Sequence, residues 1–130
     1  MSLEKIFARQ LDLQRAAYGL NPEFMDDETR AAYIRDMVLA CTDELHEALG
    51  EVGWKPWQTS RHLHHEAFGK ELVDALHFLV NLWLAAGWTA EDVEAAYFRK
   101  ADRNHARQLE GYDGVDGKCS HCHRALDEPS

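Results

Sequence analysis

The sequence predicts an all-α protein, a bundle of four to five helices followed by a short tail that contains cysteine and histidine. Apolar residues recur at helical spacing along most of the chain, and no run alternates apolar and polar residues for long enough to form a strand. Gly and Pro residues interrupt this pattern and divide it into segments of helix length. With 130 residues, of which 45% are hydrophobic, the chain suits one domain with a modest core.

The first two predicted helices have recognisable ends. The first covers residues 3 to 18, and Gly19 with the Asn21-Pro22 pair ends it. The second begins near Asp26 or Asp27, because carboxylates suit a helix N-terminus, and it runs to about residue 52. Six residues on this second helix are expected to face inward: Met37, Val38, Cys41, Leu45, Ala48 and Leu49.

Residues 53 to 57 form a loop, because they contain both Gly and Pro, and a third helix spans residues 64 to 86. Gly87 ends that helix. Thr89 and Asp92 resemble a capping box, which opens a fourth helix to about residue 110. We therefore expect a helical domain over residues 1–112 and a tail over residues 113–130.

Two pairs of acidic residues lie within the second and third helices: Glu44 with Glu47, and Glu71 with Asp74. Each pair is spaced i, i+3, so its members share one helix face, a turn apart. The third helix is apolar nearly all round, and burying unpaired carboxylates costs several kcal/mol each unless a cation compensates. The four carboxylates are therefore candidate ligands of Mg²⁺, in a number of ions that stays open, with a solvated acidic face as the alternative.

Phe78 and Asn81 extend the stripe of Glu71 and Asp74 along the third helix, at i+7 and i+10 from Glu71. An aromatic ring and an amide would thus lie beside the metal ligands. This combination predicts a nucleotide site, with phosphates at the metal and a base on the ring.

The motifs Glu44-Leu-His-Glu47 and Glu71-Leu-Val-Asp74 resemble the signature of the all-α nucleoside triphosphate pyrophosphatases, which include MazG-like enzymes and the dimeric dUTPases. The dimeric dUTPase branch is the most similar, over about residues 3 to 112. Its further matches are Gly-Trp-Lys-Pro-Trp at 53–57, Leu-His-Phe at 76–78, and Lys100, Asn104, Arg107-Gln108 and Gly111-Tyr112. The resemblance implies Mg²⁺-dependent hydrolysis of dUTP to dUMP and pyrophosphate by a homodimer or higher homo-oligomer.

Hydrolysis between the α and β phosphates needs divalent ions, an activated water and cations on the leaving pyrophosphate. Glu44 and Glu47 are the candidates for orienting or deprotonating the water. The candidate phosphate-binding residues are Lys55, Asn81, Lys100, Asn104 and Arg107. A surface position without a catalytic role is the alternative for each of these.

Base recognition needs an aromatic platform and amide hydrogen bonds, and the candidates are Gln10, Gln14, Trp54, Trp57, His77 and Phe78. Core packing is the alternative for the aromatic residues. Family members read uracil with a glutamine and an asparagine of the first helix, whereas Leu13 and Ala17 stand three residues after Gln10 and Gln14. A preference for dCTP, dGTP or another nucleotide therefore stays open beside dUTP.

Two other protein classes are alternatives. Asp74-x-x-His77, together with the Glu44 pair, is similar to di-iron carboxylate bundles, but this leaves the Trp-Lys-Pro-Trp loop unexplained. A non-catalytic zinc-bearing interaction module rests on the tail, where Cys119-x-x-Cys122 is half of a tetrahedral zinc set. The remaining zinc ligands would come from His121, His123, or the His-rich patch that follows the Gly-Pro loop, His62, His64 and His65. The alternative is a flexible tail with two free thiols and no bound zinc.

Charge and composition restrict the classes of molecule that the protein is expected to bind. The net charge of −9, without a block of Lys and Arg, disfavours nucleic acid binding. The longest apolar run, residues 79–87, is far shorter than the roughly 20 residues of a membrane span. Three cysteines, two of them in the Cys-x-x-Cys pair, and no recognisable signal peptide favour a cytoplasmic protein. The expected partners are a nucleoside triphosphate and a second copy of the chain.

Overall fold

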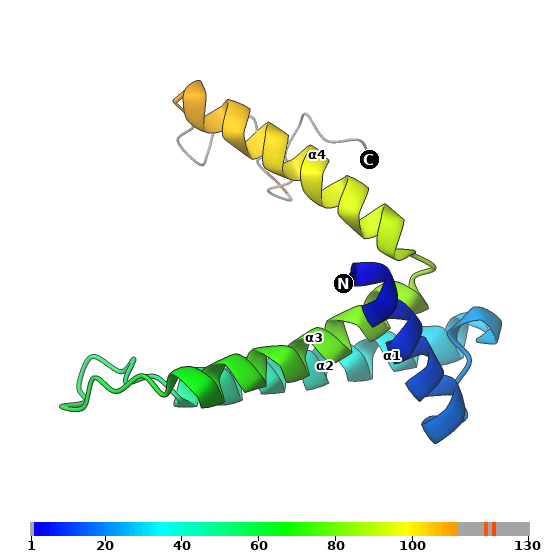
Figure 1. Ribbon diagram of the computed structural model, residues 1–130, viewed down its shortest axis with the longest axis horizontal. Helices are drawn as coiled ribbons and strands as arrows, with labels where there is room; N and C mark the ends of the chain where they lie inside the picture. Colours follow the sequence, from blue (N-terminus) through cyan, green and yellow to red (C-terminus); the bar gives the residue numbers. More distant parts are fainter. Residues whose placement is uncertain (1, 112–118, 120, 122–130) are drawn as a thin grey trace. The chain divides into compact units, whose positions relative to one another are not determined.

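The computed structural model describes residues 2–111, 119 and 121. These residues form four α-helices and a short 3₁₀-helix (Figure 1): α1 (Leu3–Tyr18), η1 (Pro22–Phe24), α2 (Asp27–Gly50), α3 (His65–Ala85) and α4 (Ala90–Leu109). Among the described residues there is no β-strand, only an isolated antiparallel bridge between Val52 and Leu63. The all-α prediction is confirmed, and η1 is an element that was not predicted.

The chain divides into two compact units, residues 1–92 and 93–130, and each is described by itself. The first unit holds α1, η1, α2 and α3, and the second holds most of α4. The predicted division at residue 112 stays a prediction. Within the described residues no single helix is both long enough and apolar enough to cross a membrane, although α3 and α4 pass that test when taken together across their bend.

In the first unit, α2 and α3 run side by side in opposite directions, and α1 packs across α3 near the end of the pair that lies away from the connecting loop (Figure 1). The small side chains of Ala48 and Ala75 are buried, which lets the two long helices approach closely. Val80 is completely buried on α3, and Phe7 of α1 stacks on Trp83 at a centroid distance of 6.1 Å. This small core holds the faces that carry the acidic residues against each other.

Local side-chain bonds fix the helix starts. The Asp26 carboxylate accepts a hydrogen bond from the Thr29 backbone N–H at 2.7 Å, which caps α2. The predicted capping box of α4 is confirmed, because Asp92 accepts from the Thr89 N–H at 2.9 Å and Thr89 Oγ1 accepts from the Asp92 N–H at 3.1 Å. These starts are local properties of the sequence, so they were predictable.

α2 ends two residues before the predicted position because the chain turns into a short antiparallel ladder. The Gly53 N–H donates to the His62 carbonyl at 2.8 Å, and the His64 N–H donates to the Glu51 carbonyl at 3.0 Å, on either side of the Val52–Leu63 bridge. The ladder closes the loop that joins α2 to α3.

Inside this loop the Arg61 guanidinium donates to four backbone carbonyls, those of Gly53, Lys55, Pro56 and Ser60. Gly53 is required, because a Cβ at this position would lie 2.3 Å from the Ser60 carbonyl oxygen. The loop is therefore held by its own side chains before any ligand binds.

The expectation that α2 buries all six residues of its apolar stripe is wrong within one chain. Val38, Leu45 and Leu49 are 45%, 50% and 36% exposed. The reason is that, within the described part of the first unit, α2 packs mainly against α3, so the flanks of its apolar stripe stay uncovered there.

Candidate active site

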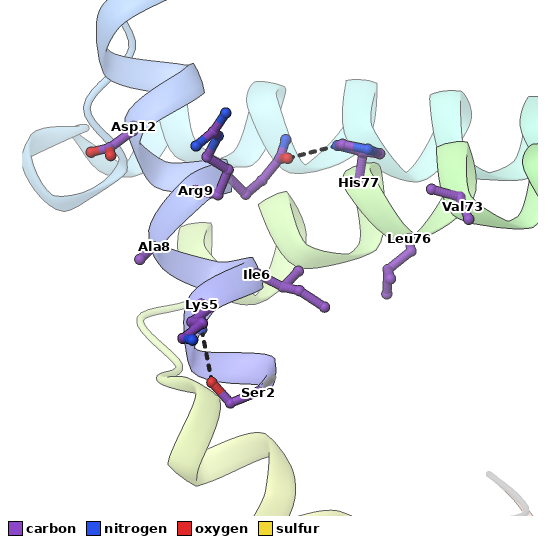
Figure 2. A pocket seen from close by; sticks show the side chains of 10 residues that line it. Ser2, Lys5, Ile6, Ala8, Arg9, Asp12, Val73, Leu76 and His77 are labelled. Carbon is purple, nitrogen blue, oxygen red and sulfur yellow. Dashed lines mark hydrogen bonds between the residues drawn. The ribbon is translucent and has the colours of Figure 1, made fainter.

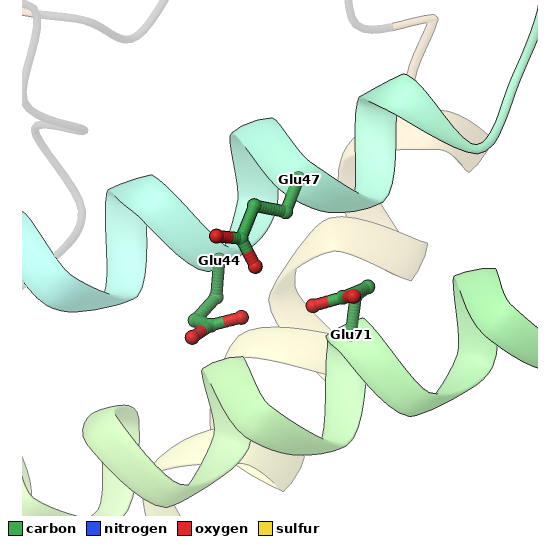
Figure 3. Close-up of side chains that lie close together, drawn as sticks. All are labelled: Glu44, Glu47 and Glu71. Carbon is green, nitrogen blue, oxygen red and sulfur yellow. The ribbon is translucent and has the colours of Figure 1, made fainter.

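Three carboxylates from α2 and α3 come together where the two helices face each other (Figure 3). One oxygen each of Glu44, Glu47 and Glu71 lies within 4.8 Å of the others, which is a spacing that can hold a metal ion. The i, i+3 spacing places Glu44 and Glu47 on one face of α2, and the antiparallel packing brings Glu71 of α3 opposite them. Three of the four predicted metal ligands therefore form one cluster.

Glu44 lies in the most constrained position of the cluster. Its Oε2 atom is buried and has no hydrogen-bond partner among the described residues. Burial raises the pKa of Glu44 to about 7, and hydrogen bonds shared with Glu71 and Glu47 and the negative charges of Glu47 and Asp74 add to the shift. A buried carboxylate oxygen without a donor is what a bound cation would satisfy.

The pKa of Glu71 is shifted by the same neighbouring carboxylates. Its hydrogen bond with Glu44 lowers its pKa, but burial and the interactions with Glu47 and Asp74 outweigh this bond, so the pKa is raised overall. The cluster thus favours either an extra proton or a cation, because its carboxylates repel one another at close range.

Asp74 is exposed and lies on α3 just beyond the cluster. It does not belong to the close carboxylate group, but together with Glu44 it lines a pocket of about 610 Å³ in the first unit. Nine further residues line this pocket: Gln10, Leu13, Gln14, Tyr18, Leu20, Met37, His77, Phe78 and Asn81. The pocket therefore joins two of the predicted metal ligands to four of the six predicted base-binding residues.

A chain of hydrogen bonds crosses one wall of this pocket. Gln10 donates from Nε2 to Oδ1 of Asn81 at 2.9 Å, and Nδ1 of His77 lies 2.7 Å from Oε1 of Gln10. Because a carbonyl oxygen only accepts, the proton between them belongs to His77 Nδ1. Asn81 Nδ2 completes the chain with a weak bond of 3.5 Å to the sulfur of Met37. His77 therefore belongs to an amide network and not to the carboxylate cluster.

Gln14, the second amide of α1, is oriented by a residue that sequence reasoning missed. The Tyr33 hydroxyl donates to Gln14 Oε1 at 2.9 Å, which leaves the amino group of Gln14 as its remaining donor. Burial raises the pKa of Tyr33 to about 12, so this hydroxyl keeps its proton. Met37 was also missed as a pocket residue. Helical spacing was the available signal, because Tyr33, Met37 and Glu44 follow one another at i, i+4 and i+11 on one face of α2.

A second pocket of about 610 Å³ lies between α1 and α3 (Figure 2) and shares Gln10 and His77 with the first. Ile6, Val73 and Leu76 give it an apolar wall, and Lys5 and Arg9 of α1 line it as well. The hydrogen bond between Gln10 and His77 therefore borders both pockets.

The loop between α2 and α3 carries three predicted base- or phosphate-binding residues, Trp54, Lys55 and Trp57. This loop lies at the end of the α2–α3 pair that is away from α1 (Figure 1), and the three residues do not line the first pocket. Lys55 Nζ is 6.0 Å from the ring centroids of both Trp54 and Trp57, and Trp57 is 75% exposed. Their predicted contacts with base and phosphate stay predictions. A loop that joins two antiparallel helices lies at only one end of the pair, and the sequence does not show whether the pocket lies at that end. The distance of the loop residues from the pocket was therefore not predictable.

The candidates on α4 belong to the second unit. Arg107 Nη1 donates to Asn104 Oδ1 at 3.4 Å, and Lys100 lies one turn before Asn104 on the same helix. In the tail, the His121 N–H donates to the sulfur of Cys119 at 3.4 Å. The other two candidate zinc ligands, Cys122 and His123, lie outside the described residues, so the zinc prediction stays a prediction.

Comparison with known proteins agrees with this geometry. A family model described as dUTPase matches residues 2–86. A dCTP pyrophosphatase of Enterobacteria phage LZ5 is 29% identical over 105 residues, and the match covers 69% of this chain and 57% of that protein. The chain thus spans little more than half the length of this relative, and no solved structure matches it. Because the family model spans α1 to α3 and all four carboxylates, the chain belongs to the dUTPase family.

Proposed function

We propose that this protein is a Mg²⁺-dependent pyrophosphohydrolase that cleaves a deoxynucleoside triphosphate, most favourably dUTP, into the nucleoside monophosphate and pyrophosphate. The observation that carries the proposal is the buried Glu44 oxygen without a hydrogen-bond partner, within a carboxylate cluster that borders a pocket lined by amides. Family membership supports the reaction class.

The donor set fits a hard divalent cation, because all of its atoms are carboxylate oxygens. Glu44, Glu47, Glu71 and Asp74 would hold Mg²⁺, which supplies positive charge to the phosphate oxygens and polarises the attacking water. The chain's own residues then position the reactants. Glu44 is half-buried with its Oε2 atom shielded, whereas Glu47 is exposed in the same cluster, so we assign Glu47 as the group that takes the proton of the attacking water.

The base would enter the amide pocket and pack against Phe78, which is half-buried in its wall. Gln14 would donate a hydrogen bond from its amino group to a carbonyl of the base. Asn81 orients Gln10 in place of the first-helix asparagine that the chain lacks. dCTP is the second candidate substrate, favoured by the similarity to the phage dCTP pyrophosphatase.

The cations for the phosphate chain would come from outside this pocket. Lys55 on the loop and Lys100 and Arg107 on α4 are the candidates, with Asn104 as a neutral donor. We assign them to the pyrophosphate leaving group, whose charge rises as the bond to the α-phosphorus breaks.

Assembly into a homodimer, or a higher homo-oligomer, would cover the apolar residues that one chain leaves exposed. On α2 and α3 these include Val38, Leu39, Leu45, Leu72, Val73 and Leu79. Light scattering coupled to size-exclusion chromatography tests this, and a monomer at micromolar concentration contradicts it. The cysteine count favours action in the cytoplasm.

The activity is tested by measuring pyrophosphate release from a panel of dNTPs and NTPs with Mg²⁺. Glu47→Gln and Asp74→Asn are expected to lower kcat by about 10²-fold or more, because each loses a charge that stabilises the transition state through the metal. Asp43→Asn, an exposed neighbour of Glu44 on α2, is the matched control and keeps full activity. Full activity in both site variants, or no hydrolysis of any nucleotide, contradicts the proposal.

A further inference from the structure

The ladder at the base of the connecting loop gathers polar side chains on one face. Val52 pairs with Leu63 in antiparallel orientation, so Glu51 stands opposite His64 and Gly53 stands opposite His62. Residues at i and i+2 of an extended segment point to the same face, so His62 and His64 share a face with Glu51 and with the side-chain-free position of Gly53.

Both imidazoles are held through the same ring atom. Nδ1 of His64 lies 2.8 Å from Oε2 of Glu51, and Nδ1 of His62 lies 2.9 Å from Oγ of Ser60. Because the Glu51 carboxylate only accepts, Nδ1 of a neutral His64 carries the proton, and its Nε2 keeps a lone pair. The Ser60 hydroxyl can accept a proton from Nδ1 of His62 in the same way, and in that tautomer His62 also keeps a lone pair on Nε2. A histidine whose other nitrogen donates to a carboxylate, as in the His64–Glu51 pair, is an arrangement that orients metal ligands in proteins.

The spacing of the two rings also suits a shared ion. Their centroids are 4.9 Å apart, with planes tilted by 30°. Two imidazoles bound to one tetrahedral zinc ion at Zn–N distances of about 2.0–2.1 Å have centroids about 5 Å apart. His64 is exposed and His62 is half-buried, so water can reach the rings and complete the coordination.

We propose that His62 and His64 form a binding site for zinc or a similar borderline divalent ion, with Glu51 and Ser60 as the residues that orient the two rings. The ion would clamp the base of the loop that carries Trp54 and Lys55. This site uses imidazole nitrogens, and it is distinct from the oxygen-only cluster of Glu44, Glu47 and Glu71.

The test is a zinc titration of the ¹⁵N-labelled full chain in excess Mg²⁺, followed by long-range ¹H–¹⁵N spectra of the histidine rings. The Nε2 signals of His62 and His64 are expected to shift together and to saturate at one equivalent of zinc. Bound zinc should also slow hydrogen exchange at the Gly53 and His64 backbone amides, which donate across the ladder.

Variants separate this site from other zinc-binding groups. His62→Gln and His64→Gln are each expected to weaken zinc binding at least about tenfold, and Glu51→Gln by about tenfold through the loss of its orienting charge. His65→Gln, the next histidine along the chain but outside the ladder, is the matched control and keeps the wild-type affinity.

Three results overturn the proposal: zinc shifts only histidines of the tail, His62 and His64 respond at different zinc concentrations, or the two substitutions leave the affinity unchanged. The spectra of the unmodified chain decide the question even where a variant folds poorly. None of these measurements depends on nucleotide hydrolysis.

Discussion

Gln10 and Asn81, which lie 71 positions apart in the sequence, share a buried hydrogen bond of 2.9 Å. Their side chains belong to residues that are only 5% and 3% exposed, so water cannot easily replace the missing partner if one is lost. The bond therefore ties α1 to α3 at the wall of the proposed base pocket, and it positions the Gln10 oxygen toward His77.

Removal of one partner of this bond should destabilise the protein more than removal of both. Asn81→Leu leaves the Gln10 amino group buried without an acceptor, so we expect the free energy of unfolding to fall by about 1–3 kcal/mol. Gln10→Leu combined with Asn81→Leu should recover part of this loss. Urea denaturation measures each variant, and Gln108→Leu, at an exposed position of α4, is the control. Strictly additive effects of the two substitutions contradict the coupling.

Tyr33→Phe should weaken substrate binding without greatly slowing the chemical step. The substitution removes the donor that orients Gln14, while the ring keeps its packing. Loss of a hydrogen bond worth about 1–1.5 kcal/mol predicts a KM that rises about five- to tenfold. Steady-state kinetics with dUTP and dCTP measure this, with Tyr97→Phe on α4 as the exposed control. A fall in kcat at constant KM would count against an orienting role.

The stability of the metal-free chain should fall as the pH rises from about 4.5 to about 7. The pKa of Glu44 is raised from 4.5 to about 7 in the folded chain, so in this range the folded state binds a proton that the unfolded state has released. The stabilisation is complete below pH 4.5 and is lost above pH 7. Thermal unfolding midpoints across this range measure the effect.

Glu44→Gln should flatten this pH profile, because glutamine has no proton to release, and should make the metal-free chain more stable than wild type above pH 7. Mg²⁺ displaces the same proton, so its affinity for the wild type should rise with pH over the same window. Glu94→Gln, an exposed position of α4, should retain the wild-type profile. An unchanged slope in Glu44→Gln assigns the pH dependence to other groups.

Gly53→Ala should destabilise the loop between α2 and α3, because the added Cβ would lie 2.3 Å from the Ser60 carbonyl oxygen. We expect a loss of about 1–3 kcal/mol in the free energy of unfolding. Gly50→Ala is the matched control, since a Cβ there meets nothing within 4 Å and α2 ends at this residue. Equal stability of both variants shows that the loop accommodates the methyl group.

The sequence by itself determined the helices and the spacing of the acidic residues. Helix caps such as Thr89 with Asp92 involve residues three positions apart, and the i, i+3 pairs require only helical geometry, so both follow from local rules. The helical periodicity was equally local. These features needed no knowledge of how the helices pack.

Only the tertiary structure decided how the site is assembled. It placed one oxygen each of Glu44, Glu47 and Glu71 within 4.8 Å of one another and brought Asn81, a candidate phosphate-binding residue, into a bond with Gln10. It also gave Gln14 its partner Tyr33. These outcomes depend on the rotation and register of α1, α2 and α3 against each other, which arise from side chains packed across helices and not from spacing along one of them.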